Sequence, residues 1–402
     1  MLWQAILLTD EGRGQRSNNQ PRYLPGIDSL RTVVHLRRPA RLTLRTMPAL
    51  QVLHVNTEPG WRGGENQVYL LHRGLVAAGI DSTVLCRAGE PLAARLRAEH
   101  LPHATISAGP LFTLRTARAI RDAATHGAII HAHASAAHTA ACLGVCATSA
   151  PLIVTRRVDF ALKRGLIARW KYGRRVTHFV AISNAVAEIL RCGGVDPARI
   201  LVIPSAGQLS DVKPDAFSRD TLHLPADHLI VLCAAALVDH KGHRHLLDAW
   251  RQIEAHGVRA TLLLAGSGER EAELRAQASG LNNVRFLGWR DDLPQLLRAA
   301  DLFTLASVEE GLGSVLIDAQ LAGLPIVATT AGGIPEVVAD GRSGLLVSPA
   351  DPTALAAALT RALTDSALRA ILAAGARLHG RLFSVDTMVA RYQALYAKLH
   401  SS

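Results

Sequence analysis

The sequence predicts an α/β fold built from two Rossmann-like domains, each with a parallel sheet. The chain has 402 residues, enough for two domains of ordinary size, and 49% of its residues are hydrophobic. Short apolar runs alternate with helical patterns over most of its length, which is typical of parallel sheets covered by helices. The alternation pauses in a polar segment around residues 207–228, and we place the boundary between the domains there.

The first half of the chain consists of predicted strand and helix units. An apolar strand at residues 51–56 runs into a glycine-containing loop and a helix from about 67 to 78. Further strands are expected at 82–86, 128–131, 152–154 and 179–182, with helices at 91–98, 113–125 and 184–191. Ser183 precedes the last helix, where its hydroxyl can accept a hydrogen bond from a free N–H group of the first turn.

The second half repeats the same alternation. Strands are expected at 229–233, 260–265, 284–287, 302–306 and 326–329. Helices are expected at 244–253, 269–278, 293–299, 314–321, 352–363, 365–375 and 384–399. Because parallel strands end at the same edge of a sheet, the loops that follow them are the expected ligand side of each domain.

Residues 1–46 precede the first predicted strand. Their short apolar run, 1–9, leads into a polar tract rich in Gly and Asn, without the core of a secretory signal. We therefore predict a disordered extension, with Met47 as the natural start. The predicted domains are residues 47–208 and 209–383, and residues 384–402 form a final helix.

The net charge of +11 is concentrated in the first half of the chain. Residues 1–205 hold 26 Lys and Arg against 12 Asp and Glu, which leaves 18 against 21 in the rest. The densest basic run lies between residues 156 and 175, with aromatic and aliphatic residues among the charges. Its proposed patch consists of Arg156, Arg157, Arg164, Arg169, Lys171 and Arg174. Such a patch suits an anionic membrane surface or an anionic acceptor, but also an ordinary solvated helix face; no sequence pattern for nucleic-acid binding accompanies it.

The cysteines and the longest uncharged stretch argue against disulfides, a zinc site and a membrane span. The five cysteines form no CxxC pair, so we expect reduced, buried thiols in a cytoplasmic protein and no metal site. Residues 134–155 lack formal charges, but Pro151 interrupts them. A buried helix followed by a buried strand is the expected structure.

One segment, residues 309–340, carries the strongest functional pattern. It contains Glu310, a glycine loop, a helix with a second carboxylate at Asp318, a strand and a second glycine turn. Two carboxylates can bind two sets of sugar hydroxyls, while free N–H groups at helix N-termini bind phosphate. The layout therefore indicates a sugar nucleotide as ligand.

This segment resembles the donor-site signature of the retaining family-four, or group 1, glycosyltransferases, and the resemblance extends over roughly residues 48–400. In that family two glutamates are separated by seven residues, and here the second is the shorter Asp318. The resemblance implies the GT-B fold, in which two Rossmann-like domains face a central cleft. It also implies an acceptor domain at 47–208, a donor domain at 209–383, and a final helix that packs back on the first domain.

The resemblance also implies roles for single residues. Lys241 matches a phosphate-binding lysine, Glu310 a carboxylate beside the donor sugar, and His133 a histidine that contacts that sugar. An arginine usual in the family about five residues before the lysine is replaced here, by Ala235 and Ala236. The implied donor-binding residues are Gly63, Gly64, Gly266, Gly268, Arg290, Gly311, Leu312, Gly313, Asp318, Gly332 and Gly333.

The implied activity is transfer of a sugar from a nucleoside-diphosphate sugar, with retention and without a metal or other cofactor. Glycan or lipid-linked acceptors of bacterial envelope polysaccharide or lipopolysaccharide synthesis fit the basic first domain, as does a cytoplasmic location at the inner face of the membrane. The alternatives are a GT-B epimerase, a transferase with a small soluble acceptor, and a non-catalytic nucleotide-sugar binding protein. A dehydrogenase is disfavoured because Glu271 replaces the third glycine of a GxGxxG motif.

Overall fold

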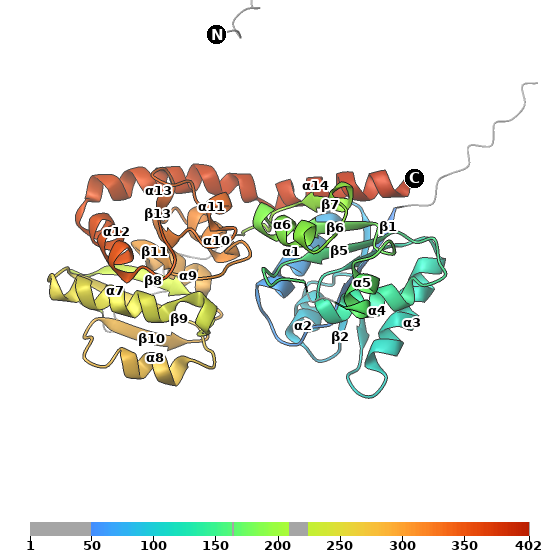
Figure 1. Ribbon diagram of the computed structural model, residues 1–402, viewed down its shortest axis with the longest axis horizontal. Helices are drawn as coiled ribbons and strands as arrows, with labels where there is room; N and C mark the ends of the chain where they lie inside the picture. The colour runs from blue at the N-terminus through green and yellow to red at the C-terminus, as the bar shows by residue number, and fades with distance from the viewer. Residues whose placement is uncertain (1–49, 163–164, 209–223, 402) are drawn as a thin grey trace, which may run out of the picture. The chain divides into compact units, whose positions relative to one another are not determined.

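The computed structural model describes residues 50–162, 165–208 and 224–401 (Figure 1). Two separate sheets of parallel strands, each covered by helices, make up this part of the chain. The predicted α/β class with two Rossmann-like sheets is therefore confirmed. The predicted extension at 1–46 and most of the polar boundary segment lie outside the described residues.

The first sheet has seven strands in the order β3-β2-β1-β4-β5-β6-β7. Its strands are β1 (Gln51–Asn56), β2 (Asp81–Arg87), β3 (His103–Ile106), β4 (Ile129–Ala132), β5 (Leu152–Arg156), β6 (His178–Ala181) and β7 (Ile200–Val202). All pairs are parallel, and in the centre Val55 of β1 lies opposite Ala132 of β4, which lies opposite Val154 of β5. The ends of β1, β4 and β5 thus meet at one edge of the sheet.

Two layers of helices bury this sheet. The helices between its strands are α1 (Gly63–Ala77), α2 (Pro91–Ala98), α3 (Phe112–Thr125), α4 (Ser135–Gly144), α5 (Leu166–Lys171) and α6 (Asn184–Cys192). Side chains of α1 and α2 share one apolar cluster with one face of the strands, and those of α3, α4 and α6 share another with the opposite face. Ser183 caps α6 as predicted, since its Oγ accepts a hydrogen bond from Val186 N at 3.1 Å.

The second sheet has six strands in the order β10-β9-β8-β11-β12-β13, all parallel. They are β8 (Leu229–Ala234), β9 (Ala260–Ala265), β10 (Val284–Gly288), β11 (Leu302–Leu305), β12 (Ile326–Thr329) and β13 (Gly344–Val347). The helices are α7 (His243–Ala255), α8 (Glu271–Gln277), α9 (Leu293–Ala299), α10 (Ser314–Leu321), α11 (Ile334–Val337), α12 (Pro352–Thr364) and α13 (Ser366–Gly380). Strands β8 and β11 are neighbours, so the loops after them lie side by side.

Helix α13 continues past its predicted end at Gly375, to Gly380. Gly375 does not end the helix because it has a packing role. A Cβ at this position would lie 1.9 Å from the carbonyl oxygen of Arg342, so only glycine allows the approach.

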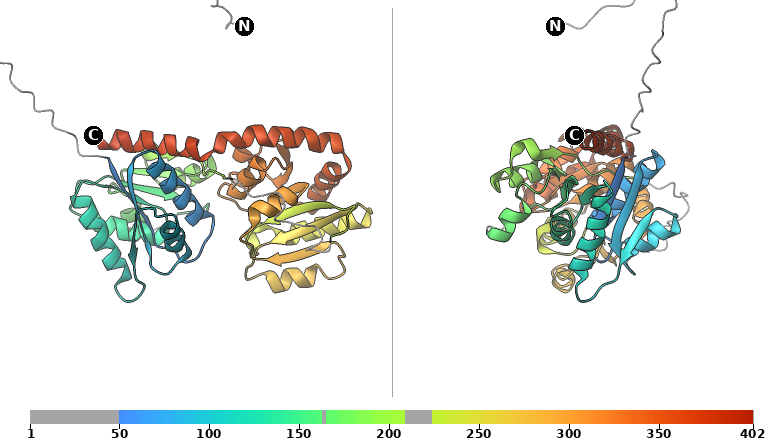
Figure 2. Two further views of the ribbon diagram at one scale, coloured as in Figure 1. Left: turned by 180° about the vertical axis from the view of Figure 1, so that it is seen from behind. Right: turned by 90° about the vertical axis from the view of Figure 1, so that its right-hand side faces the viewer.

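After α13 the chain returns to the first sheet as α14 (Val385–His400) (Figure 2). Helix α14 packs against α1, and Gly74 of α1 allows the contact, since a Cβ there would lie 2.5 Å from Val389. The hydroxyl of Tyr396 lies 2.6 Å from Nδ1 of His131, and the hydroxyl of Tyr392 lies 3.1 Å from Oγ1 of Thr155. The last helix thus completes the polar interior of the first domain.

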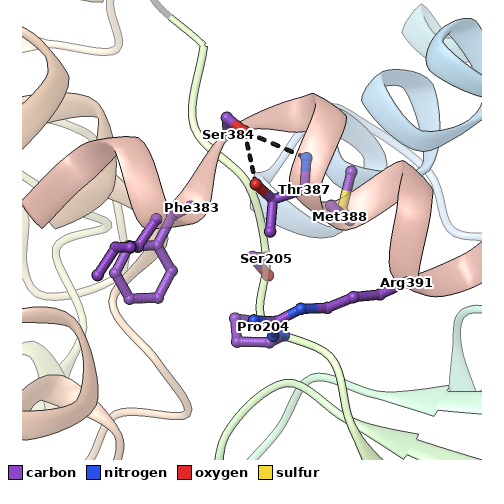
Figure 3. Close-up of a pocket in the computed structure, with 8 residues that line it drawn as sticks. Pro204, Ser205, Phe383, Ser384, Thr387, Met388 and Arg391 are labelled. Carbon is purple, nitrogen blue, oxygen red and sulfur yellow. Dashed lines mark hydrogen bonds between the residues drawn. The ribbon is translucent and has the colours of Figure 1, made fainter. Parts of the chain in front are cut away.

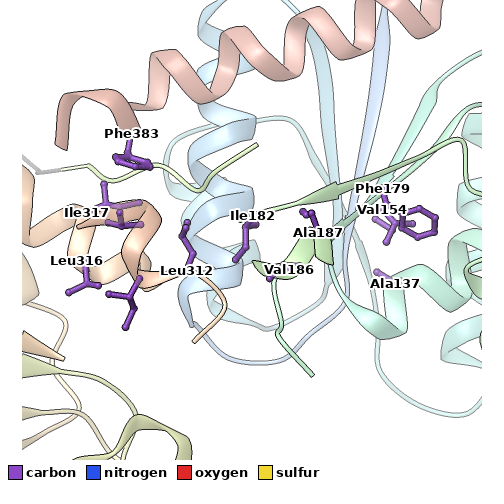
Figure 4. Packing of buried hydrophobic residues seen from close by; sticks show 14 of the residues in the cluster. Ala137, Val154, Phe179, Ile182, Val186, Ala187, Leu312, Leu316, Ile317 and Phe383 are labelled. Atoms are coloured by element: carbon purple, nitrogen blue, oxygen red, sulfur yellow. The ribbon is translucent and has the colours of Figure 1, made fainter. Parts of the chain in front are cut away.

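Buried apolar residues form a cluster that continues from the first domain into the second (Figure 4). In the middle of the cluster Ile182, which follows β6, and Leu312, which precedes α10, are almost fully buried. Ile317 of α10 and Phe383 extend it towards the start of α14. The position of the α10 loop therefore depends on residues of both domains.

None of the helices in the described part of the chain combines the length and apolar character needed to cross a bilayer. The uncharged stretch at 134–155 forms α4 and β5, as the sequence predicted.

Two glycines with nearly the same backbone conformation provide a matched test of packing around β8. Gly242 has φ +66° and a Cβ there would lie 2.0 Å from the carbonyl oxygen of Ala306, whereas Gly257 has φ +69° and open space. Gly257→Ala should lower the free energy of unfolding by about 1 kcal/mol, the strain of a left-handed backbone at alanine. Gly242→Ala should lower it by more than about 2 kcal/mol, because its Cβ also has no room. Thermal unfolding of both variants measures the difference. Equal melting temperatures would contradict the close approach.

Candidate active site

Lys241 and Glu310 form an ion pair at the ends of two neighbouring strands. Lys241 ends a short 3-10 helix, Asp239–Lys241, that follows β8, and Glu310 follows β11. The Lys241 Nζ lies 2.5 Å from the Glu310 Oε2, and the Ser307 hydroxyl donates to the same oxygen at 3.2 Å. Only 20% and 11% of the two side chains are exposed. The carboxyl ends of adjacent parallel strands are a usual ligand site in open α/β sheets.

Glycines hold the loop that carries Glu310. Gly332 has φ +50° and a Cβ there would lie 1.8 Å from the carbonyl oxygen of Glu310, while Gly333 donates its N–H to the same oxygen at 3.0 Å. A Cβ on Gly311 would lie 2.7 Å from the carbonyl oxygen of Arg157. Gly313, with φ +77°, is the N-cap of α10, and Leu312 is buried. These residues fix the Glu310 backbone and aim the start of α10 at the same region.

The loop after β9 supports Lys241 from the other side. A Cβ on Gly266 would lie 1.9 Å from the carbonyl oxygen of Ala235, and one on Gly268 would lie 2.3 Å from that of Leu237. The loop therefore packs directly on the segment between β8 and Lys241. Arg290, after β10, has a different environment, because Nε and Nη2 bind both oxygens of Asp292 at 2.7 and 2.5 Å.

Asp318 contacts the segment that joins the two domains. Its Oδ1 accepts a hydrogen bond from the backbone N–H of Gln208 at 3.2 Å. Burial raises the pKa of this carboxyl to about 7, so near neutral pH a large fraction is protonated. The family resemblance implied a contact with the nucleotide ribose, and the structure adds a contact with the linker that the sequence did not indicate.

His133 lies in a buried histidine cluster at the end of β4. Its Nε2 is 2.9 Å from the Nδ1 of His54, a residue of β1 that sequence reasoning missed. The two rings stack with centroids 5.2 Å apart. Burial holds the pKa of both imidazoles well below the usual value, so both are neutral and share one N–H in this contact.

His131 completes the cluster, whose three histidines have ring nitrogens within 4.8 Å of one another. Both nitrogens of His131 are engaged, Nδ1 with Tyr396 and Nε2 with Thr155 at 2.7 Å. Among the described residues this is the one group with the composition of a metal site, but its nitrogens bind mostly to one another and to hydroxyls. His54 and His131 lie opposite each other in adjacent strands, a register that only the structure shows.

Gly63 and Gly64 begin α1 directly opposite the start of α10. A Cβ on Gly63 would lie 3.4 Å from the Ser314 Oγ, and one on Gly64 would lie 3.8 Å from Arg157 Cδ. The first turn of each helix carries N–H groups without an intrahelical partner. The two loops that the sequence assigned to the donor are therefore neighbours.

Polar contacts join the two domains close to these loops. The Ser183 hydroxyl donates to the Gly311 carbonyl oxygen at 2.6 Å. The carboxylate of Glu336 accepts hydrogen bonds from the backbone N–H groups of Asn184 and Ala185, at 2.8 and 3.1 Å. Glu336 thus binds the N-terminus of α6 from the other domain, where a negative charge is favoured.

The residues of the basic patch fall into different environments. Arg169 and Arg174 are exposed beside Leu166 and Ile167, whose exposed fractions are 83% and 74%. Lys171 donates to the carbonyl oxygen of Ser135 at 3.0 Å and Arg156 to the Tyr172 hydroxyl at 3.0 Å. Arg157 points inward, and Arg164 lies outside the described residues.

A small pocket lies where the chain passes between the domains (Figure 3). Pro204, Ser205, Phe383, Ser384 and Arg391 are among its lining residues. Neither Lys241 nor Glu310 lines it, so this pocket is separate from the candidate site.

Comparison with known proteins identifies both halves of the chain. Residues 61–206 match the model of Glycosyltransferase Family 4, and residues 228–365 match that of Glycosyl transferases group 1. The D-inositol 3-phosphate glycosyltransferase of Salinispora tropica is 30% identical over 88% of this chain and 83% of its own length. The lipopolysaccharide core biosynthesis glycosyltransferase LpsE of Rhizobium meliloti is 35% identical, over 39% of this chain and 46% of its own length.

A solved structure shows the same fold. The crystal structure of HepE from Anabaena, in complex with UDP and glucose, superposes with a TM-score of 0.77 at 22% identity, over 87% of this chain and 99% of that one. The fold is therefore GT-B. Together with the match over most of a relative's length, these findings show that the chain belongs to the family 4, or group 1, glycosyltransferases and is an enzyme of that class.

Proposed function

We propose that this protein transfers a sugar, with retention, from a nucleoside-diphosphate sugar to a glycan or lipid-linked acceptor in bacterial envelope polysaccharide or lipopolysaccharide synthesis. The ion pair between Lys241 and Glu310 carries the proposal, because it joins a cation and a carboxylate at the strand ends where the donor binds. The names of the relatives favour a transferase over the epimerase and the non-catalytic binder that the sequence left open.

The chemistry requires a stabilised leaving group. As the anomeric bond breaks, negative charge grows on the β-phosphate oxygen, and a positioned cation lowers the energy of that transition state. Lys241 supplies the ammonium group, and the N-terminus of α10 supplies free N–H groups after Gly313. Glu310 then binds hydroxyls of the donor sugar, and the acceptor hydroxyl attacks from the face that the phosphate leaves, giving its proton to the departing phosphate oxygen. With the leaving group stabilised in this way, we propose that no metal is required.

The donor's base and sugar are best identified by binding. The crystal structures of HepE contain UDP, UDP with glucose, and UDP-glucose, which makes uridine nucleotides the first to test here. A ligand that binds only the folded state raises the melting temperature of the protein by mass action. A thermal-shift series of UDP-, GDP- and ADP-sugars identifies the donor. The donor found in this way should then be hydrolysed slowly without acceptor, which is measured as release of the nucleoside diphosphate. If no nucleotide sugar raises the melting temperature, the proposal is wrong.

Lys241→Ala should lower turnover by about two to three powers of ten, because one transition-state charge contact is lost. The Glu310 carboxylate, 11% exposed, loses its partner, so the protein should still fold but with a lower melting temperature. Product formation with the best donor, measured beside thermal unfolding, checks both. Activity within a few-fold of wild type would mean that other residues stabilise the leaving group.

Glu310→Gln should damage turnover more than Asp318→Asn. Glu310 is paired with Lys241 beside the reacting sugar. The amide introduced by Asp318→Asn, in contrast, would still offer an oxygen to the Gln208 N–H and resembles the protonated carboxyl. Steady-state kinetics of both variants separate the effects on kcat from those on the KM of the donor. Equal losses that appear only in KM would contradict this division of roles.

The exposed part of the basic patch provides the proposed membrane contact. Leu166 and Ile167 project from α5 next to Arg169, and Arg174 is exposed just beyond the helix. Apolar side chains beside cations suit a surface of anionic lipid headgroups. This contact would bring the enzyme to a lipid-linked acceptor at the inner face of the membrane.

Binding to anionic vesicles should be measurable at low salt and should weaken steeply as salt rises. Each exposed basic residue contributes about 1 kcal/mol near the surface, and screening acts over roughly 8 Å at physiological salt. Changing Arg169 and Arg174 to Ser should reduce binding strongly, whereas the same change at Arg118 and Arg361, exposed elsewhere, should not. Vesicle sedimentation measures this. If the wild-type protein does not bind anionic vesicles at low salt, the proposed membrane contact is wrong.

A further inference from the structure

Arg157 is a half-buried cation whose hydrogen-bonding capacity is mostly unused. It follows β5, and its Nη1 donates to the Ser205 Oγ at 3.2 Å. Its Nε and Nη2 are buried without a partner. Among the described residues no carboxylate forms an ion pair with it. Glu65 lies within electrostatic range, but its oxygens accept from Arg62 N and Asn56 Nδ2 at 3.0 and 3.3 Å.

Such an arrangement is unfavourable unless an anion completes it. Taking a guanidinium out of water without a partner carries a large desolvation penalty, so buried charges are normally paired. A buried donor without an acceptor therefore calls for a specific explanation, such as an ion or ligand. The planar guanidinium has a geometry that matches a phosphate, which it can bind through two parallel N–H groups.

The neighbours of Arg157 are also positive. The start of α1 approaches it at Gly64, and the start of α10 approaches α1 at Gly63 and Ser314. The first intrahelical hydrogen bond of α1 runs from Asn66 N to Arg62 O, so the N–H groups before it are free for another acceptor. Two helix N-termini and a guanidinium thus meet at one place, and each favours an anion there.

His133 offers a further donor close to Arg157. His131 of β4 and Thr155 of β5 are hydrogen-bonded to each other. His133 and Arg157, the first residues after these two strands, lie so close together that, besides burial, the charge of Arg157 lowers the pKa of His133. The Nδ1 of His133 is buried without a partner. If His54 donates in the contact between the two histidines, the neutral His133 carries its proton on Nδ1 and can donate it.

We infer that Arg157, with the N-terminus of α1 and Nδ1 of His133, binds a phosphoryl group at the junction of the two domains. The inference rests on the proposed function, because the phosphoryl group belongs to the diphosphate of the donor or to a phosphate on the acceptor. Arg157 and α1 lie in the first domain and α10 in the second, so a small separation of the domains along residues 204–208 makes room for it.

The competing explanation is that Arg157 only holds the linker through Ser205. Two variants separate these roles. Arg157→Gln removes the charge and the fork of donors, whereas Ser205→Ala removes only the hydrogen bond to the linker. If Arg157 binds an anion, Ser205→Ala should bind like wild type. Arg118→Gln, an exposed change on α3, controls for the loss of one charge.

The experiment measures binding of UDP, inorganic pyrophosphate and inorganic phosphate by titration calorimetry, together with melting temperatures without ligand. Arg157→Gln should weaken binding of the affected ligand by about 10- to 100-fold, as expected for the loss of charge-assisted hydrogen bonds. Arg157→Lys keeps the charge but not the paired N–H donors of the guanidinium, so its affinity should lie between those of wild type and Arg157→Gln. Without ligand, Arg157→Gln should melt no lower than wild type, because an unpaired buried charge is removed.

The pattern of losses identifies the source of the phosphoryl group. Weaker UDP and pyrophosphate binding assigns it to the donor. Unchanged UDP binding, with loss of phosphate binding to the protein saturated with UDP, assigns it to the acceptor. If all three ligands bind Arg157→Gln as they bind wild type, or if Ser205→Ala causes the same loss, the inference is wrong. Phosphate binding that depends on Arg157 in a protein that binds no nucleotide would overturn the proposed function and leave the anion site standing.

Discussion

The ion pair between Lys241 and Glu310 depends on loops that pack at backbone distance. Gly242 approaches the Ala306 carbonyl oxygen, Gly332 that of Glu310, and Gly266 that of Ala235, each so closely that a Cβ would lie within 2.0 Å of the oxygen. The loops after β8, β9, β11 and β12 therefore form one packed layer. Because this layer rests on backbone contacts, the two charged side chains emerge from positions with little freedom, which favours a preorganised site.

The same layer is held in part by the first domain. Ser183 binds the Gly311 carbonyl oxygen, Glu336 binds the start of α6, and the apolar cluster runs through Ile182 and Leu312. The amide of Gln67 in α1 makes two hydrogen bonds to the backbone of Ala206, at 2.6 and 2.8 Å. Hydrogen bonds and apolar packing from both domains thus fix the connection between them. A substitution in one domain can alter the donor loops of the other through them.

Asp318 and Arg157 show how these contacts bring charge into the interior. The carboxyl of Asp318 is directed to the linker and has its pKa raised to about 7 by burial. The guanidinium of Arg157 donates a hydrogen bond to Ser205 of the same linker. Among the residues that the structure describes, each makes one hydrogen bond where its chemistry allows several. An acidic and a basic side chain thus contact the same linker, and each retains capacity for a ligand.

The sequence by itself determined the two-sheet α/β class, most helices and central strands, and the strand ends that carry Lys241 and Glu310, because hydrophobic periodicity and glycine positions are local signals. It did not indicate the edge strands β3, β7 and β13, whose three or four residues carry almost no pattern. Only the tertiary structure decided that His54 pairs with His133, that Asp318 contacts the linker and that Arg157 points inward. Each of these depends on segments far apart in the chain, so their charges and hydrogen bonds are set by packing that no local pattern records.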